Sequence, residues 1–260
     1  MNPNWKLLEQ VFTAETLMTP AGELFSWEAG SQRGDIAGLF ERTHFDVIPV
    51  TSDDKITGLL TKASCNVLPL THDWLISADT SVPDLIELFV ETGRPGYLLL
   101  QGREIIGLVT PADLNKVPAR SFIYLLIGEL EMMLAAWIGQ RLLTPEEILE
   151  QLSARRQELV RTEWSRLVCG NAEVNVIELL TLSDLLGIIE RREDLRAFFE
   201  FPSRSKAHDY LGGLRVLRND TMHTVRPLIR HLPEDLVTLQ KRIQRAGSVM
   251  TRLNGAGSES

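Results

Sequence analysis

Arginine, asparagine and histidine lie close together near the C-terminal end of this 260-residue sequence, in the segment LRNDTMH from Leu217 to His223. The guanidinium of Arg218 stays charged and its planar fork suits a phosphate group. His223 is of the residue type that titrates near neutral pH. Asn219 precedes His223 by four residues, so the two share one face of a helix and Asn219 would support His223. These residue types suit phosphate binding and proton transfer.

A second interpretation of this segment is structural. Basic side chains favour the C-terminal ends of helices, so Arg218 and His223 could simply stabilise such an end. On one regular helix the five steps of about 100° between them also place the two side chains far apart around the axis. A cleft between two chains would relieve that separation. Arg226 and His231 repeat the spacing, with Pro227 between them.

A second candidate site lies in the segment GLVTPAD, from Gly107 to Asp113. Thr110 is expected to be the N-cap of a helix, with Pro111 at the first helical position. Free backbone N–H groups at such an end favour an anion such as phosphate. The Asp113 carboxylate could accept hydrogen bonds from two vicinal hydroxyls. The alternative is a plain capped helix, in which Thr110 and Asp113 only satisfy backbone donors.

The segment around Asp113 is the second copy of an internal repeat. Residues 35–64 align with residues 84–113 without a gap, at an offset of 49 residues. Repeats of such a period indicate one supersecondary unit each. Each copy predicts a helix (35–43; 84–91), an apolar strand (47–51; 97–100), a turn and a second strand that ends at a shared Gly-Leu-x-Thr. Two such α/β units are expected to pack together.

This order of elements resembles a CBS domain, present twice. The segments LMTP (17–20), IPV (48–50) and GLVTPAD (107–113) resemble the family's first-repeat start, its apolar-Pro-Val strand and its closing signature. The resemblance implies that an adenine nucleotide binds as a regulatory ligand at Thr110 and Asp113, with no further cofactor required and no metal.

Both copies depart from the family pattern. In the first copy Ser64 stands where the aspartate is expected, three residues after Thr61. A serine hydroxyl offers fewer and weaker contacts than a carboxylate, which puts a site at Thr61 and Ser64 in doubt. In the second copy Tyr97 begins a strand that lacks the expected proline. Its ring could stack on a base or lie in the core.

Strand signals end at Ala119, so we expect an α+β protein in which the two-repeat module is followed by an all-α bundle. Thr144-Pro145 predicts a helix start, and Ser203 is expected to cap the helix that carries Arg218. The predicted helices cover 122–141, 144 to about 159, 171–191, 193–201, 204–225 and 233–253. The expected domains are 1–118 and 119–254, with a disordered tail at 255–260.

The Arg-Asn-x-x-x-His segment in an all-helical context resembles the HEPN superfamily of helical bundles, many of which are metal-independent ribonucleases. That resemblance implies that Arg218 holds the scissile phosphate, that His223 transfers protons with support from Asn219, and that RNA is a partner. Two functions therefore stay open. One is a ligand-gated RNA endonuclease; the other is a non-catalytic sensor whose helical half serves dimerisation or partner docking.

The charge distribution bears on the partner. The formal net charge is -8, yet residues 202–252 hold 10 Lys/Arg against 4 Asp/Glu. Such a local basic segment says more about binding than the total charge does. The sequence has no Gly-rich phosphate loop, no His/Cys metal cluster and no nucleophile–base spacing, which argues against a conventional metabolic enzyme.

Location and assembly can also be predicted. The apolar run from Phe122 to Gly139 contains Glu129 and Glu131, which would be costly at bilayer depth, so a buried helix and no membrane are expected. The first ten residues do not form a signal peptide, and Cys65 and Cys169 share no short metal spacing, which fits the cytoplasm. The long apolar run also favours a homodimer.

Overall fold

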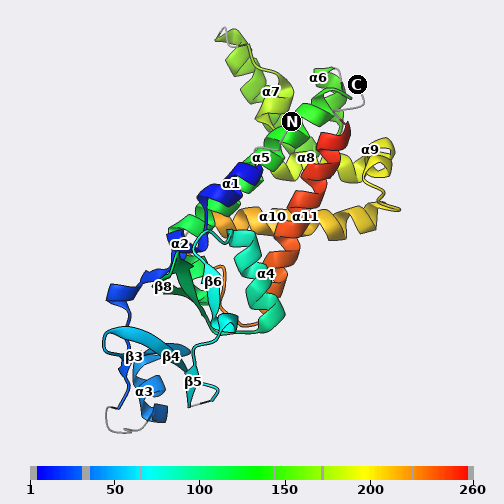
Figure 1. Cartoon of the computed structure of the whole chain (residues 1–260). Coiled ribbons are helices and arrows are strands. Elements are labelled where there is room, and N and C mark those ends of the chain that lie inside the picture. Colours follow the sequence, from blue (N-terminus) through cyan, green and yellow to red (C-terminus); the bar gives the residue numbers. More distant parts are fainter. Residues whose placement is uncertain are drawn as a thin grey trace. The chain divides into compact units, whose positions relative to one another are not determined.

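The computed structural model describes residues 5–30, 36–64, 66–142, 144–170, 173–223 and 225–256. Strands and short helices make up the chain before Val117. From Val117 onward, the regular elements of the described residues are all helices (Figure 1). This confirms the expected α+β class, in which two small mixed sheets precede a helical region.

The chain forms two compact units. The first, here the sheet unit, consists of Leu7–Phe122 together with Pro227–Gln240. The second, here the helical unit, consists of Met1–Lys6, Ile123–Arg226 and Lys241–Ser260. A segment far along the chain therefore belongs to the sheet unit.

Two four-stranded sheets build the sheet unit. Their strand orders are β2-β3-β4-β5 and β1-β8-β7-β6. The strands are β1 (Thr19–Pro20), β2 (Trp27–Glu28), β3 (Val47–Ser52), β4 (Lys55–Thr61), β5 (Val67–Pro69), β6 (Leu75–Ser77), β7 (Tyr97–Gln101) and β8 (Glu104–Val109).

The sheets repeat one another closely, as the offset of 49 residues predicts. Each contains an antiparallel hairpin, β3–β4 or β7–β8, preceded by a helix, α3 (Ile36–Thr43) or α4 (Val82–Thr92). The register of each hairpin shifts at one place, between Val50 and Thr51 and between Leu99 and Leu100. The offset places Val50 on Leu99, so the repeat includes this irregularity. Asp35, where the first helix was expected to begin, lies outside the described residues.

The edge strands show why a glycine stands near the end of each hairpin. β5 pairs antiparallel with β4, placing Gly58 opposite Pro69, and β1 pairs antiparallel with β8, placing Gly107 opposite Pro20. A Cβ at Gly58 would lie 2.6 Å from a backbone carbonyl oxygen of β5, and one at Gly107 equally close to a carbonyl oxygen of β1. Only glycine admits edge strands this close. The second sheet takes its edge strand from the N-terminal part of the chain.

Local signals set the ends of α4. The Ser81 hydroxyl accepts a hydrogen bond from the N–H of Asp84, as an N-cap does, and Gly93 ends the helix with a left-handed φ of 63°. Val82, Leu85, Ile86 and Phe89 recur at helical spacing and are buried. One face of α4 therefore covers apolar side chains, while Glu87 and Glu91 face water.

The remaining elements are helices. They are α1 (Trp5–Val11), α2 (Ala14–Leu17), α5 (Val117–Gly139), α6 (Pro145–Glu150), α7 (Ala154–Cys169), α8 (Leu182–Arg191), α9 (Glu193–Phe198), α10 (Arg204–Met222) and α11 (Glu234–Ala256). The short 3-10 helices are η1 (Ala21–Glu23), η2 (His72–Trp74), η3 (Pro111–Asn115) and η4 (Val176–Leu179). The expected caps Thr144 and Ser203 are confirmed, since each side chain accepts a hydrogen bond from the N–H three residues later.

Several predicted helices differ from the structure: the one expected over 122–141 runs from Val117 to Gly139, and the one expected over 204–225 ends at Met222. The helix expected over 171–191 is wrong in its first half, because Asn175 caps only η4 and Thr181 then caps α8 at Leu182. Such side chains compete with helical backbone bonds. The helix expected from Thr144 to about Leu159 is divided into α6 and α7, and Leu159 is 54% exposed. The last helix continues through Ala256 into the expected tail; residues 257–260, like 171–172 and Cys65, lie outside the described residues.

α5 is long and apolar enough to cross a membrane by length and composition alone, a test that core helices of folded proteins also pass. Of the 18-residue apolar stretch of this helix, 44% is buried inside the protein. Glu129 and Glu131 are both partly buried.

Candidate functional site

The Thr110–Asp113 pair lies where β8 ends. Thr110 has extended backbone angles, and Pro111 begins η3, so the expected helix is a 3-10 turn of five residues. One Asp113 carboxylate oxygen, Oδ2, accepts hydrogen bonds from the Thr110 backbone N–H at 2.6 Å and from its hydroxyl at 2.8 Å. Asp113 is 8% exposed. The carboxylate is therefore fixed in one orientation at the end of the strand.

Lys116 occupies the other oxygen of this carboxylate. Its Nζ lies 2.7 Å from Asp113 Oδ1 and donates to the backbone carbonyl of Leu17 at 2.6 Å, with the carbonyl of Met18 at 3.4 Å. The ammonium group thus ties Asp113 to the segment that precedes β1. A hydroxyl that binds Asp113 must share the carboxylate with Lys116 or displace it. Sequence reasoning missed Lys116, although a lysine three residues after an aspartate is a recognisable pairing.

The first repeat brings Thr61 and Ser64 together in a similar way. Their side-chain oxygens are 3.0 Å apart, and the Ser64 N–H lies 3.4 Å from the Thr61 hydroxyl. The Ser64 hydroxyl also donates to the backbone carbonyl of Asn66 and accepts from its N–H, both at 3.3 Å. The serine is thus engaged locally and brings no charge.

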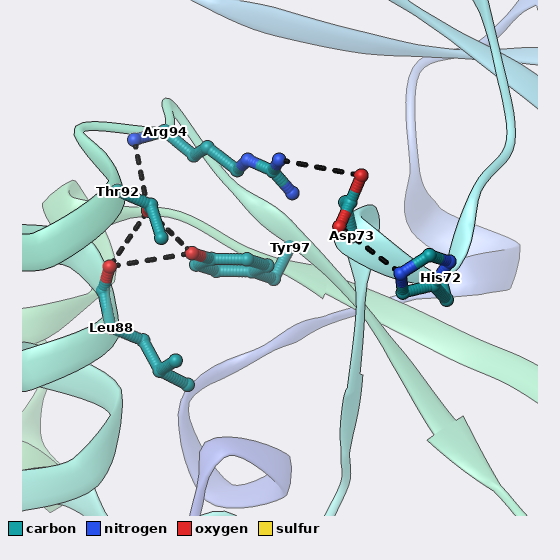
Figure 2. A network of polar contacts seen from close by, with 6 residues as sticks. All are labelled: His72, Asp73, Leu88, Thr92, Arg94 and Tyr97. Carbon is teal, nitrogen blue, oxygen red and sulfur yellow. Dashed lines mark hydrogen bonds and ion pairs between the residues drawn. The ribbon is translucent and has the colours of Figure 1, made fainter.

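Tyr97 lies in the core of the sheet unit. The residue is 2% exposed, and its ring centroid lies 5.4 Å from that of Phe89. Figure 2 shows its hydroxyl beside Thr92, at 2.5 Å, and near the carbonyl of Leu88, at 3.3 Å. A base stacked on this ring would need a solvent-exposed face that Tyr97 does not present.

A second polar group lies near Tyr97 in Figure 2. Arg94 reaches Asp73 at 3.8 Å, and Asp73 also contacts His72 at 3.3 Å. The Arg94 guanidinium lies 4.7 Å from the centre of the Trp74 ring, a cation–π contact. Arg94 follows α4 and the other three belong to η2, so this group stabilises the packing of two loops.

Arg218, Asn219 and His223 lie at the C-terminal end of α10. His223 is the residue that ends the helix, and its N–H donates to the Asn219 carbonyl at 3.1 Å. Asn219 and His223 are exposed and Arg218 is partly buried. Within the described part of the chain, no hydrogen bond or ion pair joins these three side chains to one another. A single chain therefore does not hold these three side chains around one point before a ligand binds.

A buried ion pair lies elsewhere on the same helix. Glu190 of α8 is 7% exposed, and its carboxylate lies 2.6 Å from Arg215 and 3.3 Å from His208, both on α10. Because a carboxylate is costly to bury unpaired, these contacts fix α8 against α10. Neighbouring Arg191 has a pKa below its ordinary value, mainly because of burial and then because of the charge of Arg204. The helix that carries Arg218 is thereby held to α8 at His208 and at Arg215, the latter three residues before Arg218.

The described residues contain no group of three or more His, Cys, Asp or Glu side chains that could hold a metal ion.

No family model matches this sequence, and no curated protein matches it. Solved structures match roughly its first 110 residues. The CBS domain of a bacterial CNNM/CorC family Mg2+ transporter in complex with ATP is 15% identical; the match covers 43% of this chain and 89% of that chain, with a TM-score of 0.36. CBSX2 in complex with AMP is 15% identical over 40% and 92% of the chains, with a TM-score of 0.34. The CBS domains of a transcriptional regulator from Streptococcus pneumoniae are 16% identical over 40% and 97%, with a TM-score of 0.33. The helices from α5 onward lie outside this similarity.

Proposed function

We propose that this protein is a ligand-sensing regulator in which residues 1–118 form a CBS pair. An adenine nucleotide binds the second repeat, where Thr110 and Asp113 hold the ribose hydroxyls. The fixed, buried Asp113 carboxylate at the end of β8 carries this proposal. The uncharged Thr61–Ser64 pair makes the first repeat the weaker site. Occupancy of the second repeat controls the helical residues 119–254.

We further propose that this helical region is HEPN-like and cleaves RNA without a metal ion. Arg218 holds the scissile phosphate. His223, supported by Asn219, takes the proton from a 2′-hydroxyl as that oxygen bonds to phosphorus. The bond to the 5′-oxygen breaks, and that oxygen takes a proton from solvent, to which His223 then releases its own. The products are a 2′,3′-cyclic phosphate and a 5′-hydroxyl end. The exposed His223 and the excess of basic residues over 202–252 support this output.

A second output is supported by a different observation. Beyond its first residue, Val117, α5 exposes three large apolar side chains, Tyr124 at 54%, Leu125 at 42% and Met132 at 63%. Such a face is suited to a protein partner or a second copy of the chain. In this version the protein is a non-catalytic sensor, and the helical region is its docking or dimerisation part.

One experiment separates these functions. The purified protein is incubated with total RNA in the presence of EDTA, with and without millimolar ATP, ADP or AMP, and calorimetry measures nucleotide binding by the same samples. His223→Ala is expected to abolish cleavage. His231→Ala, which removes another exposed histidine of the same basic segment, is expected to retain it.

Each outcome has a meaning. Nucleotide binding without RNA cleavage would identify the non-catalytic sensor, and cleavage that survives His223→Ala would exclude the proposed catalytic role. If no adenine nucleotide binds at millimolar concentration, the sensor itself is excluded.

A further inference from the structure

Asn115 joins two distant parts of the sheet unit through its side chain. It is the last residue of η3, two residues after Asp113. Its Oδ1 accepts hydrogen bonds from the N–H of Leu228 at 2.6 Å and of Ile229 at 3.0 Å, and its Nδ2 donates to the Ile229 carbonyl at 3.0 Å. One amide side chain therefore holds two consecutive backbone residues more than 110 positions away.

The segment that it holds is the connector, residues 225–233, which lies between α10 and α11. Asp235 holds the next two residues: its Oδ2 accepts from the N–H of Arg230 at 2.7 Å and of His231 at 2.8 Å. Ile229 is 7% exposed. Four consecutive backbone N–H groups, from Leu228 to His231, are thus satisfied by two side chains rather than by a helix or a strand.

The connector follows the Arg218–His223 segment along the chain. His223 ends α10, and Leu228, the first residue that Asn115 holds, follows it by five positions. A change at Leu228 therefore occurs five positions along the chain from His223.

We infer that Asn115 is a positioning residue that couples occupancy of the Thr110–Asp113 site to the connector. The inference rests on the proposed nucleotide sensor. A ribose hydroxyl at Asp113 competes with Lys116 for the carboxylate, which changes the bonds that fix η3. Asn115 is part of the same five-residue turn and transmits that change to Leu228 and Ile229. Asp235 holds the next two residues of the connector, Arg230 and His231.

The test measures the connector itself, without reference to RNA. Hydrogen–deuterium exchange is followed at the amides of Leu228 and Ile229 in the full chain, with and without saturating ATP. ATP is expected to change their exchange rates by at least about 5-fold, the lower end of the range typical of coupled sites. In Asn115→Ala the two amides are expected to exchange faster and no longer to respond to ATP. Asn115→Ser, a smaller change at the same position, is expected to give the same result if the alanine variant does not fold.

The first repeat supplies a matched control. The offset of 49 residues places Asn66 on Asn115, and Asn66 is exposed, with its backbone rather than its side chain bonded to Ser64. Asn66→Ala is expected to leave the ATP response of Leu228 and Ile229 unchanged.

Failures of the inference and of the sensor can be told apart by calorimetry on the same samples. If ATP binds but leaves the two amides unchanged, or if the response survives in Asn115→Ala or Asn115→Ser, the inference is overturned while the sensor stands. If ATP, ADP and AMP all fail to bind, both are overturned.

Discussion

In the proposed ligand site, Asp113 combines a structural and a binding role in one carboxylate. Its two oxygens are already engaged, one by Thr110 and the other by Lys116. A ligand therefore meets an oriented group and exchanges bonds with it, so little conformational freedom is lost on binding. The same bonds mean that a substitution here acts on stability as well as on affinity, and the two effects must be measured separately.

We predict that Asp113→Ala weakens adenine-nucleotide binding by about 1.5–3 kcal/mol, the usual contribution of hydrogen bonds to a charged group. Isothermal titration calorimetry measures the effect. Ser64→Ala, the matching change in the first repeat, is expected to leave the affinity nearly unaltered. Equal losses in the two variants would contradict the assignment of the ligand to the second repeat.

The second prediction concerns the effect of Gly107 on stability. A Cβ at Gly107 would lie 2.6 Å from the Thr19 carbonyl oxygen and 2.5 Å from the Met18 sulfur. Because β1 is paired with β8, the carbonyl cannot move away freely, and Gly107→Ala is expected to cost about 1–3 kcal/mol of unfolding free energy. Urea unfolding measures this. Gly22→Ala, where a Cβ meets nothing within 4 Å, is expected to change stability by less than about 0.5 kcal/mol.

The elements of the sheet unit could be predicted well because they repeat. Helix, strand, turn and strand recur with the same pattern, and the shared Gly-Leu-x-Thr fixes where each hairpin ends. The two-residue strands β1 and β2 could not be predicted, since so short a segment has no periodicity of its own. The helix over 171–191 was wrong because Asn175 and Thr181 cap new helices inside an apolar pattern that looks continuous.

In the candidate site too, some contacts could be predicted from the sequence and others could not. The contact between Thr110 and Asp113 follows from a spacing of three residues, which the sequence displays. The bonds from Asn115 to Leu228 and Ile229 join residues 113 and 114 positions apart through one side chain. No pattern in a single sequence reports such a contact. Tyr97 stayed ambiguous for a similar reason, since an aromatic residue that begins a strand can face either the core or a ligand.

The start of α11 gives a pH-dependent prediction. The pKa of Asp235 lies below its ordinary value, first because the His231 N–H donates to it; partial burial opposes this, and the Arg230 N–H adds to it. A lowered carboxyl pKa contributes stability above the ordinary value of about 3.9, and this is lost as the pH falls through the native pKa. Asp235→Ala is therefore expected to lower the unfolding free energy at pH 7 by about 0.5–2 kcal/mol, as the loss of a helix cap does.

The check is urea unfolding of the wild-type protein and of Asp235→Ala at pH 7 and near pH 3. The difference between their unfolding free energies is expected to be smaller at the lower pH, where the wild-type carboxylate begins to gain a proton. A difference that is equal at both pH values would show that the charge of Asp235 contributes nothing.

We predict that the protein is a homodimer. The exposed side chains of Tyr124, Leu125 and Met132 on α5 offer an apolar face, and closed two-fold dimers are the commonest assembly. A dimer would also allow Arg218 of one protomer and His223 of the other to meet at one phosphate. Light scattering at micromolar concentration is expected to give twice the chain mass of 29.3 kDa. A mass of about 29 kDa, or a dimer undisturbed by Met132→Lys, would contradict this arrangement.

The composition of the sheet unit has a consequence for its synthesis on the ribosome. β1 leaves the ribosome before β8, so both sheets can close as soon as the second hairpin appears. The partners of Asn115 follow it by 113 and 114 residues, which at about 5–20 residues per second takes about 6–23 seconds. During that interval the nascent sheet unit has both sheets but lacks the connector. The proposed ligand site is therefore expected to form first, and the contacts of Asn115 with the connector only when translation is nearly complete.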